Sequence, residues 1–151
     1  MYAKTVYLSG PMRGYELWNF PAFDNAQEML ESVGWNVISP AQMDREHGFD
    51  EYSETEFSPE QWHEAMRRDY DALLQSDAIA LLPGWENSEG ANLERDFAIR
   101  LGLEVYYIDI EARMIHPSVI IGLCGYAQSG KDTLAAYLTQ NWMFERRAFA
   151  D

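Results

Sequence analysis

Two acidic residues, Asp69 and Glu94, stand at positions of predicted helices that face the protein core. On a helical wheel of about 100° per residue, each lies inside the apolar stripe of its helix and is expected to point toward a sheet. The stripe residues are Trp62, Met66 and Leu73 in one helix and Leu93, Phe97 and Leu101 in the other. Two carboxylates can act on a glycosidic bond, one as nucleophile and one as acid/base. The alternative for each acid is an ion pair with a buried arginine or a cap on a neighbouring backbone.

A glycine-containing turn after the first predicted strand offers a second chemical feature. Residues 10–14 (GPMRG) bring backbone amides and Arg13 to the sheet edge where the acids are expected, so that a phosphate or carboxylate could bind there. Residues 87–90 (NSEG) precede the helix of Glu94 and add a hydroxyl and further amides. The two segments predict a phosphate cradle. The alternative is an ordinary strand-to-helix connection with a solvent-facing arginine.

Tyr7, on the first predicted strand, is the aromatic residue that we connect with the acids, because its phenol could donate a hydrogen bond to Glu94. Four aromatic residues after the first loop are assigned to packing at a helix start, with one of them available for a ligand: Tyr15, Trp18, Phe20 and Phe23. His47, His63 and His116 do not have the spacing of metal ligands, and we expect no metal and no other cofactor.

The elements that must position these residues alternate between strands and helices, which is typical of a parallel sheet wrapped by helices. Strands are predicted at 4–9, 35–39, 77–82 and 104–110, and helices at 21–33, 59–75 and 90–101. Pro40 is expected to stop the second strand, and Ser58 to cap the helix that begins at Pro59. The acidic segment 43–58 lacks a clear period and is predicted to be a long, lid-like loop.

A second pattern follows a predicted linker at 111–117. A strand is expected at 119–124, then the sequence GYAQSGKDT and a helix to about Trp142. This is a Walker A pattern, formed by Gly125, Gly130, Lys131 and Thr133, with Asp132 where serine or threonine is usual. Eighteen residues follow Thr133, too few for the remaining parts of a kinase, so we expect a vestigial P-loop. The predicted domains are 1–112 and 113–151, although the last strand could instead extend the first sheet.

The composition limits the partners and the location of the protein. Twenty-five acidic and eleven basic residues give a net charge of -14, which opposes binding to nucleic acid. There is no apolar stretch of about 18 residues and no signal-peptide pattern, so we expect no membrane partner. The single Cys124 cannot form an internal disulfide, which is typical of a reducing compartment. We therefore expect a cytoplasmic protein.

Several motifs, taken together, carry a resemblance to a known family. They are residues 7–14 (YLSGPMRG), Arg68 and Asp69 with Asp77 eight positions further on, and residues 88–94 (SEGANLE) with Ala98 and Gly102. Over about residues 4–110 the chain resembles the nucleoside 2-deoxyribosyltransferase superfamily. Ser88 stands where the transferases proper carry an aspartate, which is more similar to the nucleoside 5′-monophosphate N-glycosidase branch. Pro11 departs from that branch, whose members often have a serine there.

The resemblance implies a flavodoxin-like (Rossmann-like), doubly wound parallel sheet and an enzyme that hydrolyses the N-glycosidic bond of a (2′-deoxy)nucleoside 5′-monophosphate. Glu94 would be the nucleophile, Asp69 would act as acid/base or hold a sugar hydroxyl, and Tyr7 would orient Glu94. The residues implied around the 5′-phosphate are Gly10, Arg13, Gly14, Ser88 and Gly90. Family members are usually homodimers or higher homo-oligomers that complete each other's pockets.

Three alternatives remain at this point. The first is transfer of the deoxyribosyl group to a second base, and the second is a module that binds a nucleotide without turnover. The third takes the P-loop as the main site, since the C-terminal segment resembles the opening of deoxynucleoside monophosphate kinases. This resemblance implies that Lys131 would reach the phosphates and that a hydroxyl would hold magnesium. The whole chain then resembles the front of a longer bifunctional protein of nucleotide metabolism.

Overall fold

The structure is a computed structural model that describes residues 3–53, 56–118 and 130–141. It divides into two compact units, Met1–Ser118 and Val119–Asp151. In the second unit, α5 (Lys131–Asn141) begins directly after Gly130, whose φ is +83°. The predicted strand 119–124 and Gly125 of the Walker A pattern lie outside the described residues, so the P-loop stays a prediction.

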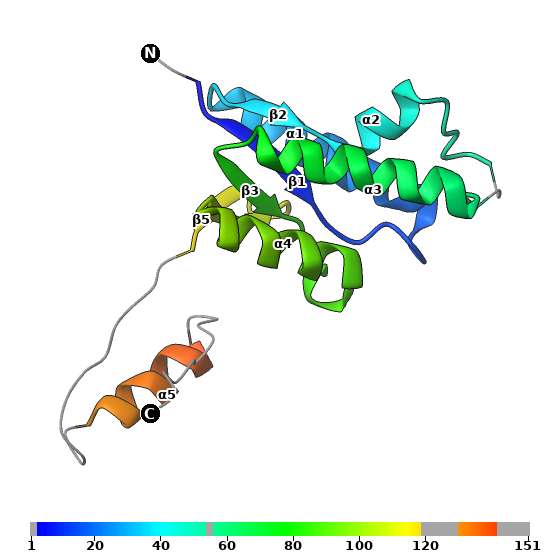
Figure 1. Ribbon diagram of the computed structural model, residues 1–151. Helices are drawn as coiled ribbons and strands as arrows, with labels where there is room; N and C mark the ends of the chain where they lie inside the picture. Colours follow the sequence, from blue (N-terminus) through cyan, green and yellow to red (C-terminus); the bar gives the residue numbers. More distant parts are fainter. Residues whose placement is uncertain (1–2, 54–55, 119–129, 142–151) are drawn as a thin grey trace. The chain divides into compact units, whose positions relative to one another are not determined.

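The first unit is built on one five-stranded sheet with the order β2-β1-β3-β4-β5. The strands are β1 (Thr5–Ser9), β2 (Asn36–Ile38), β3 (Ala78–Leu81), β4 (Glu104–Asp109) and β5 (Met114–Pro117). The first four run parallel, and β5 pairs antiparallel with β4. This strand order is that of flavodoxin-like doubly wound sheets, in which ligands bind beyond the carboxyl ends of the strands. The predicted parallel sheet is confirmed (Figure 1).

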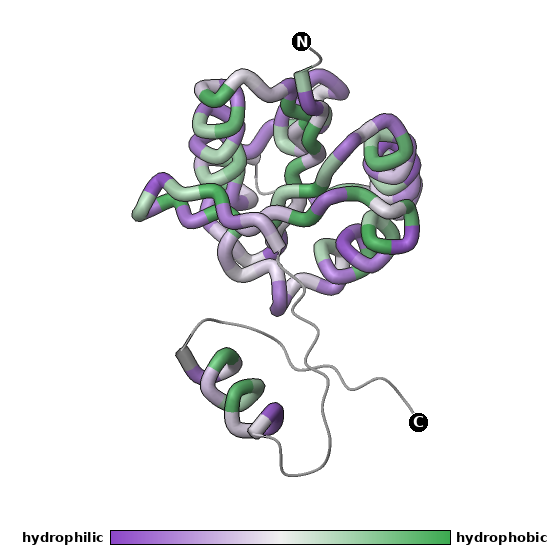
Figure 2. Tube along the Cα trace, turned by 90° about the vertical axis from the view of Figure 1, so that its left-hand side faces the viewer, coloured by the Kyte–Doolittle hydropathy of each residue, from purple (hydrophilic) through white to green (hydrophobic). Residues whose placement is uncertain are grey.

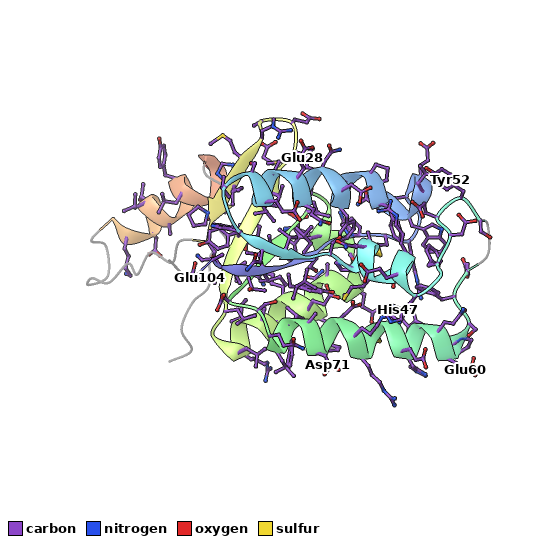
Figure 3. The ribbon with its side chains drawn as sticks, turned by 90° about the horizontal axis from the view of Figure 1, so that it is seen from above. Glu28, His47, Tyr52, Glu60, Asp71 and Glu104 are labelled. Carbon is purple, nitrogen blue, oxygen red and sulfur yellow. The ribbon has the colours of Figure 1, made fainter. Side chains whose placement is uncertain are left out.

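Helices cover both faces of this sheet. They are α1 (Phe20–Ser32), α2 (Pro40–Glu46), α3 (Pro59–Leu74) and α4 (Glu89–Leu101), with short 3-10 turns η1 (Glu16–Asn19) and η2 (Trp85–Asn87). Figure 3 shows α1, which carries Glu28, on one side of the strands and α3, which carries Asp71, on the other. Ser58 caps α3 by accepting a hydrogen bond from the Gln61 amide, as predicted.

Successive side chains of β1 point to opposite faces of the sheet, and the core accordingly has two layers. Val6 and Leu8 pack with Phe20 and Phe23 at the start of α1, whereas Tyr7 packs with Leu73 of α3 and with α4. Hydrophobic stretches therefore lie along the inner strands, and polar residues lie along the outer sides of the helices (Figure 2). Within the described ranges, no helix combines the length and the apolar run needed to cross a membrane.

The prediction of a loop from residue 43 onward was wrong for its first residues, because α2 covers Pro40–Glu46. Pro40 does not merely end the second strand; it occupies the first turn of a helix, where a missing amide proton costs little. Ala41 is fully buried, and Asp44 is buried against Arg68 of α3 at 2.9 Å. Tertiary packing stabilises a helix that is too short for a periodic signal.

The predicted linker at 111–117 was also wrong in part, since it contains the edge strand β5. A tight turn after β4 makes this possible: Asp109 accepts a hydrogen bond from the Ala112 amide at 2.8 Å, and Arg113 has a positive φ of 50°. Ile115 packs against the core, but the neighbouring residues of β5 are exposed. An exposed edge strand of four residues has too little apolar alternation to be detected from sequence.

Candidate active site

Glu94 reaches from α4 to the carboxyl end of β1, where two hydroxyl groups bind its carboxylate. The Tyr7 hydroxyl donates to Oε1 at 3.0 Å, and the Ser9 hydroxyl donates to Oε2. Tyr7 and Ser9 are two positions apart on one strand, so their side chains lie on the same face, and both residues are 0% exposed. The hydrogen bond expected between Tyr7 and Glu94 is present; the role of each residue in catalysis stays a prediction.

Asp69 approaches the same phenol from α3. The pKa of Asp69 is raised to about 8, first by burial and then by the negative charges of Glu94 and Asp44, against the opposing effects of Tyr7 and Arg68. Burial also raises the pKa of Glu94 to about 7, while hydrogen bonds from Ser9 and Tyr7 act in the opposite direction. The two acids therefore lie close enough to interact, a separation that their spacing in the sequence could not give.

Tyr7 remains a neutral donor between these acids. Its burial, followed by the charges of Glu94 and Asp69, raises the pKa of the phenol well above the ordinary value. The pKa of Tyr70 in α3 is also raised, first by burial and then by the charges of Glu94 and Asp69. Strongly shifted titratable groups of this kind are typical of functional sites.

Small residues make up much of the inward faces of the helices that carry the acids, and only part of each predicted apolar stripe is buried. Leu93 and Leu101 are 49% and 39% exposed, whereas the buried residues of α4 are Ala91 and Ala98. In α3, Trp62 is 38% exposed, and the buried residues are Ala65, Ala72 and Leu73. Alanines let the helix backbones approach the sheet, so a carboxylate on the same side reaches the strand ends. The inward direction of Asp69 and Glu94 was right, and Leu73 and Phe97 of the predicted stripes pack in the core, but the prediction was wrong for Trp62, Leu93 and Leu101.

The structural alternative for the two acids is not supported. Arg68, the basic residue next to Asp69, forms its ion pair with Asp44 at 2.9 Å. Among the ion pairs of the described residues, none includes Asp69 or Glu94. Two buried carboxylates without a paired cation are costly for stability, which favours a functional reason for their position.

The first predicted phosphate-binding loop lies against Gly84, in the segment that leads from β3 to the second predicted loop. A Cβ atom placed on Gly84, which has a φ of +84°, would stand 2.7 Å from the Tyr15 hydroxyl and 3.4 Å from Pro11. Arg13 is exposed and stacks on Trp62 of α3, with 5.6 Å from its guanidinium carbon to the ring centroid. The first loop thus bridges the segment after β3 and the start of α3.

The individual residues of the cradle differ in their surroundings. Gly10 has a packing role, because a Cβ there would lie 2.7 Å from the Cβ of Leu82. Ser88 caps α4 by accepting a hydrogen bond from the Ala91 amide at 3.3 Å, and its hydroxyl can still donate its own proton. Gly14 and Gly90 have no atom within 4 Å of a virtual Cβ, so their backbones are open to a ligand.

A cavity of about 390 Å³ lies between the first loop and the acidic segment. Its walls include Gly14, Tyr15 and Trp18 on one side and Glu51, Tyr52 and Glu56 on the other. Leu17, Trp18 and Asn19 all have positive φ values, of 49°, 54° and 62°. Consecutive left-handed residues other than glycine store strain, which persists where the surrounding structure imposes it. Trp18 was assigned to packing; it lies edge-on to Phe49 at 5.4 Å and also lines this cavity.

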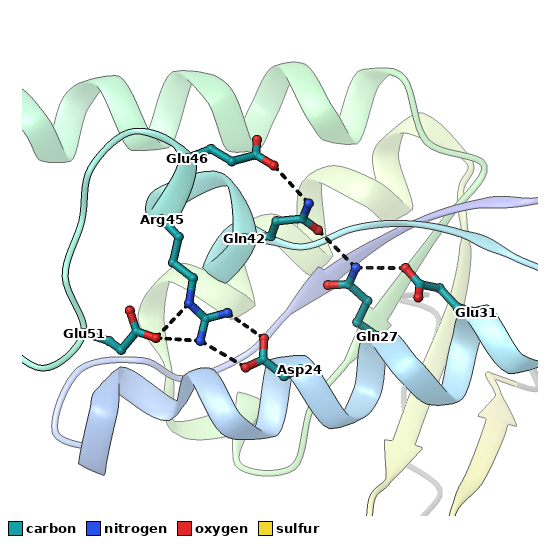
Figure 4. A network of polar contacts seen from close by, with 7 residues as sticks. All are labelled: Asp24, Gln27, Glu31, Gln42, Arg45, Glu46 and Glu51. Carbon is teal, nitrogen blue, oxygen red and sulfur yellow. Dashed lines mark hydrogen bonds and ion pairs between the residues drawn. The ribbon is translucent and has the colours of Figure 1, made fainter.

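Arg45 of α2 holds the acidic segment in place. Its guanidinium binds Asp24 of α1 at 2.8 Å and Glu51 at 2.7 Å (Figure 4). This network joins α1, α2 and the loop that follows α2. Among the described residues, no group of three histidine, cysteine, aspartate or glutamate side chains is arranged to hold a metal ion.

Sequence reasoning missed Ser9, Asp44 and Arg68 as neighbours of the acids. The signal for Ser9 was present, because a strand places residues 7 and 9 on one face, but a small hydroxyl at a strand end does not stand out. Asp44 and Arg68 belong to different helices, and only the tertiary structure brings them together.

The fold and the site define a class: a flavodoxin-like α/β protein with a buried pair of carboxylates at the carboxyl end of its first strand. Residues 4–107 match the profile of DUF4406, a domain of unknown function, and the chain belongs to this family. No curated protein matches the chain.

A search of solved structures finds the same fold in a 2-deoxyribosyltransferase from the psychrotolerant bacterium Bacillus psychrosaccharolyticus. The two chains share 19% sequence identity, with a TM-score of 0.51. The match covers 76% of this chain and 99% of the other. At this level of identity the likeness establishes the fold.

Proposed function

We propose that this protein hydrolyses the N-glycosidic bond of a nucleoside 5′-monophosphate, of the 2′-deoxy series, with retention of configuration. The observation that carries the proposal is the convergence of Asp69 and Glu94 on the phenol of Tyr7. A paired acid and carboxylate is the arrangement used by retaining glycosidases, one group attacking and the other transferring protons. The neighbouring fold of a 2-deoxyribosyltransferase supports chemistry at the bond between sugar and base.

In the proposed first step, ionised Glu94 attacks C1′ of the sugar. The bond from C1′ to the base nitrogen breaks, its electron pair leaves with the base, and protonated Asp69 donates a proton to the departing base. The raised pKa of Asp69, caused first by burial and then by the charge of Glu94, keeps a proton available near neutral pH. The product of this step is a glycosyl ester of Glu94.

In the second step, water replaces the base. Asp69, now ionised, accepts a proton from the water as its oxygen bonds to C1′, and the ester bond to Glu94 breaks with its electron pair returning to the carboxylate. Two inversions at C1′ give net retention. Tyr7 donates to Glu94 whenever this carboxylate is free, and thereby orients it for attack.

The 5′-phosphate is proposed to bind at the cradle formed by Gly10, Arg13, Gly14, Ser88 and Gly90. The N-terminus of α4 favours an anion, and the open backbones of Gly14 and Gly90 allow a close approach. Arg13 adds a positive charge in a chain whose net charge is -14. A nucleotide is thus drawn to this edge despite the overall repulsion.

A chromatographic assay of base release from a panel of nucleoside 5′-monophosphates, with and without a second base, tests the proposal. Hydrolysis predicts free base without an acceptor. A new nucleoside that forms only with the acceptor would instead establish base exchange, the second candidate, which the structural neighbour favours. A binding module would release no base from any substrate, and both wild type and Glu94→Ala would bind the nucleotide.

The P-loop alternative has a separate test. If the nucleotide binds at the C-terminal segment, Lys131→Ala will abolish binding, while Arg13→Ala and Glu94→Ala will leave it unchanged. The proposal predicts the reverse, with binding weakened by Arg13→Ala and unaffected by Lys131→Ala. Isothermal titration with a nucleoside monophosphate distinguishes these outcomes.

We also propose a homodimer or a higher homo-oligomer. The exposed apolar side chains of α3 and α4 offer a surface for self-association: Trp62, Leu74, Leu93, Ile99 and Leu101. Light scattering coupled to size-exclusion chromatography measures the mass in solution, and a monomer of 17.4 kDa would contradict this part of the proposal.

A further inference from the structure

Ser9 directs a fully buried hydroxyl at the proposed nucleophile. It is the last residue of β1 and is 0% exposed. Its hydroxyl donates to Oε2 of Glu94, whereas the hydroxyl of Tyr7 donates to Oε1. Each carboxylate oxygen therefore accepts one hydrogen bond from a strand residue, and the plane of the carboxylate is defined by two donors.

The backbone around Ser9 is held firmly. Ser9 pairs with Leu81 of β3, and its carbonyl oxygen accepts a hydrogen bond from the Leu82 amide at 2.8 Å. The next residue, Gly10, has no room for a side chain against Leu82. The Ser9 hydroxyl is thus a preorganised donor that needs little reorganisation when charge develops nearby.

The contacts of the two acids are unequal. The phenol of Tyr7 interacts with both, but the Ser9 hydroxyl adds a second donor to Glu94. Asp69 faces the charges of Glu94 and Asp44, opposed by Arg68, and Tyr70 is the further titratable group near the pair. Donated hydrogen bonds favour the ionised form of a carboxyl, and neighbouring negative charges favour the protonated form.

We propose that Ser9 is a positioning residue that sets the division of labour within the pair: its hydroxyl keeps Glu94 oriented and ionised for attack, so that the proton resides on Asp69. This inference rests on the proposed function, because it assigns the nucleophile and the acid of that reaction. Ser9 acts through Glu94 and does not itself touch the reacting atoms.

The pH profile of kcat/KM for base release tests the proposal in Ser9→Ala. Loss of the donor disfavours the ionised form of Glu94, so the acidic limb of the profile is expected to move upward by about one pH unit. Activity then falls roughly tenfold at pH values below the limb and much less above it. Ser9→Thr, which retains a hydroxyl, is expected to restore the position of the limb.

Ser39→Ala is the matched control. Ser39 follows β2, is 2% exposed, and its hydroxyl has no hydrogen-bond partner among the described residues. This variant removes a buried hydroxyl from a strand end without touching the acids, and its profile should match that of the wild type. If Ser9→Ala lowers activity by one factor at every pH, Ser9 is a packing residue and the proposal fails.

A second measurement separates this inference from the proposed function. The carboxyl resonance of Glu94, assigned by its loss in Glu94→Gln, can be titrated by ¹³C NMR without substrate. If the midpoint of the Glu94 titration moves to higher pH in Ser9→Ala, and the wild type releases base, both proposals are supported. No shift with normal turnover overturns the Ser9 inference alone. If the titration of Glu94 shifts in Ser9→Ala but the wild-type protein releases no base, the proposed reaction is overturned, and with it the nucleophilic role of Glu94. The contact between Ser9 and Glu94 would still stand.

Discussion

Two acidic clusters of this protein differ in how their charges are balanced. Asp69 and Glu94 are buried near each other and form no ion pair among the described residues, and burial raises the pKa of each. At the surface, Asp24 and Glu51 share the guanidinium of Arg45, whose hydrogen bond lowers the pKa of Glu51 (Figure 4). The surface carboxylates share a cation, whereas the pair that we propose to act in chemistry is held by neutral donors.

The largest expected difference between the clusters is in catalysis. Glu94→Gln removes the proposed nucleophile, and base release should fall by at least about 10³-fold, as is typical when a covalent nucleophile is lost. The matched surface change, Asp24→Asn, should leave the rate within about twofold. Steady-state assays of both variants measure this ratio. Comparable losses in the two variants would remove the distinction between the clusters.

The next effect concerns stability against pH. The pKa of Asp69 is about 4 in the unfolded chain and is raised to about 8 in the folded protein. The wild type therefore loses stability as the pH rises between these two values. Asp69→Asn should therefore be nearly equal in stability to the wild type at pH 4 and more stable than it by several kcal/mol at pH 9, because each unit of pKa difference is worth about 1.4 kcal/mol. Urea denaturation at both pH values measures the free energy of unfolding. A difference independent of pH would contradict the raised pKa.

The surface cluster should show a smaller effect of opposite sign. Because the pKa of Glu51 is lowered in the folded state, this residue stabilises the protein at pH values above its ordinary pKa of 4.5. The contribution is lost as pH falls through the pKa that Glu51 has in the folded protein. Glu51→Gln should destabilise the protein at pH 7 by less than about 1 kcal/mol, because Arg45 is partly exposed and solvent screens the pair. The difference should shrink as pH falls below 4.5, and a difference that stays constant with pH would point to lost packing instead.

The smallest effect is the dependence of the surface cluster on salt. Arg45→Met keeps part of the apolar stem but removes the charge shared by Asp24 and Glu51. Thermal unfolding should show a decrease in Tm of a few degrees at low salt, and a smaller one in 1 M NaCl, where the Debye length is about 3 Å. The buried pair provides the contrast, since the stability change of Asp69→Asn should depend little on salt.

The sequence predicted most of the first unit because its signals are local. The alternation of strands and helices and the cap at Ser58 were confirmed, and the acids were correctly placed on the inner sides of their helices. The errors lie where local signals are weak. The helix α2 and the strand β5 are each stabilised by packing or pairing with residues far away in sequence.

The candidate site shows the same limit in more detail. The helical wheel of α4 correctly placed Glu94 on the inner side, but it predicted that Leu93 and Leu101 are buried. The buried residues of this helix are Ala91 and Ala98. Hydrophobicity alone favours leucine, but close approach of a helix to a sheet requires small side chains. Tyr15 and Pro11 lie close to Gly84 after β3, a proximity that no spacing in the sequence indicates.

By itself, the sequence determined most of the element types, the parallel sheet and the presence of two inward carboxylates, because periodicity and capping act over a few neighbouring residues. Only the tertiary structure decided that Tyr7, Ser9, Asp69 and Glu94 meet at one strand end, and that Arg68 pairs with Asp44 instead of Asp69. The protonation of an acid depends on its burial and on the charges around it, and both are properties of the packed molecule.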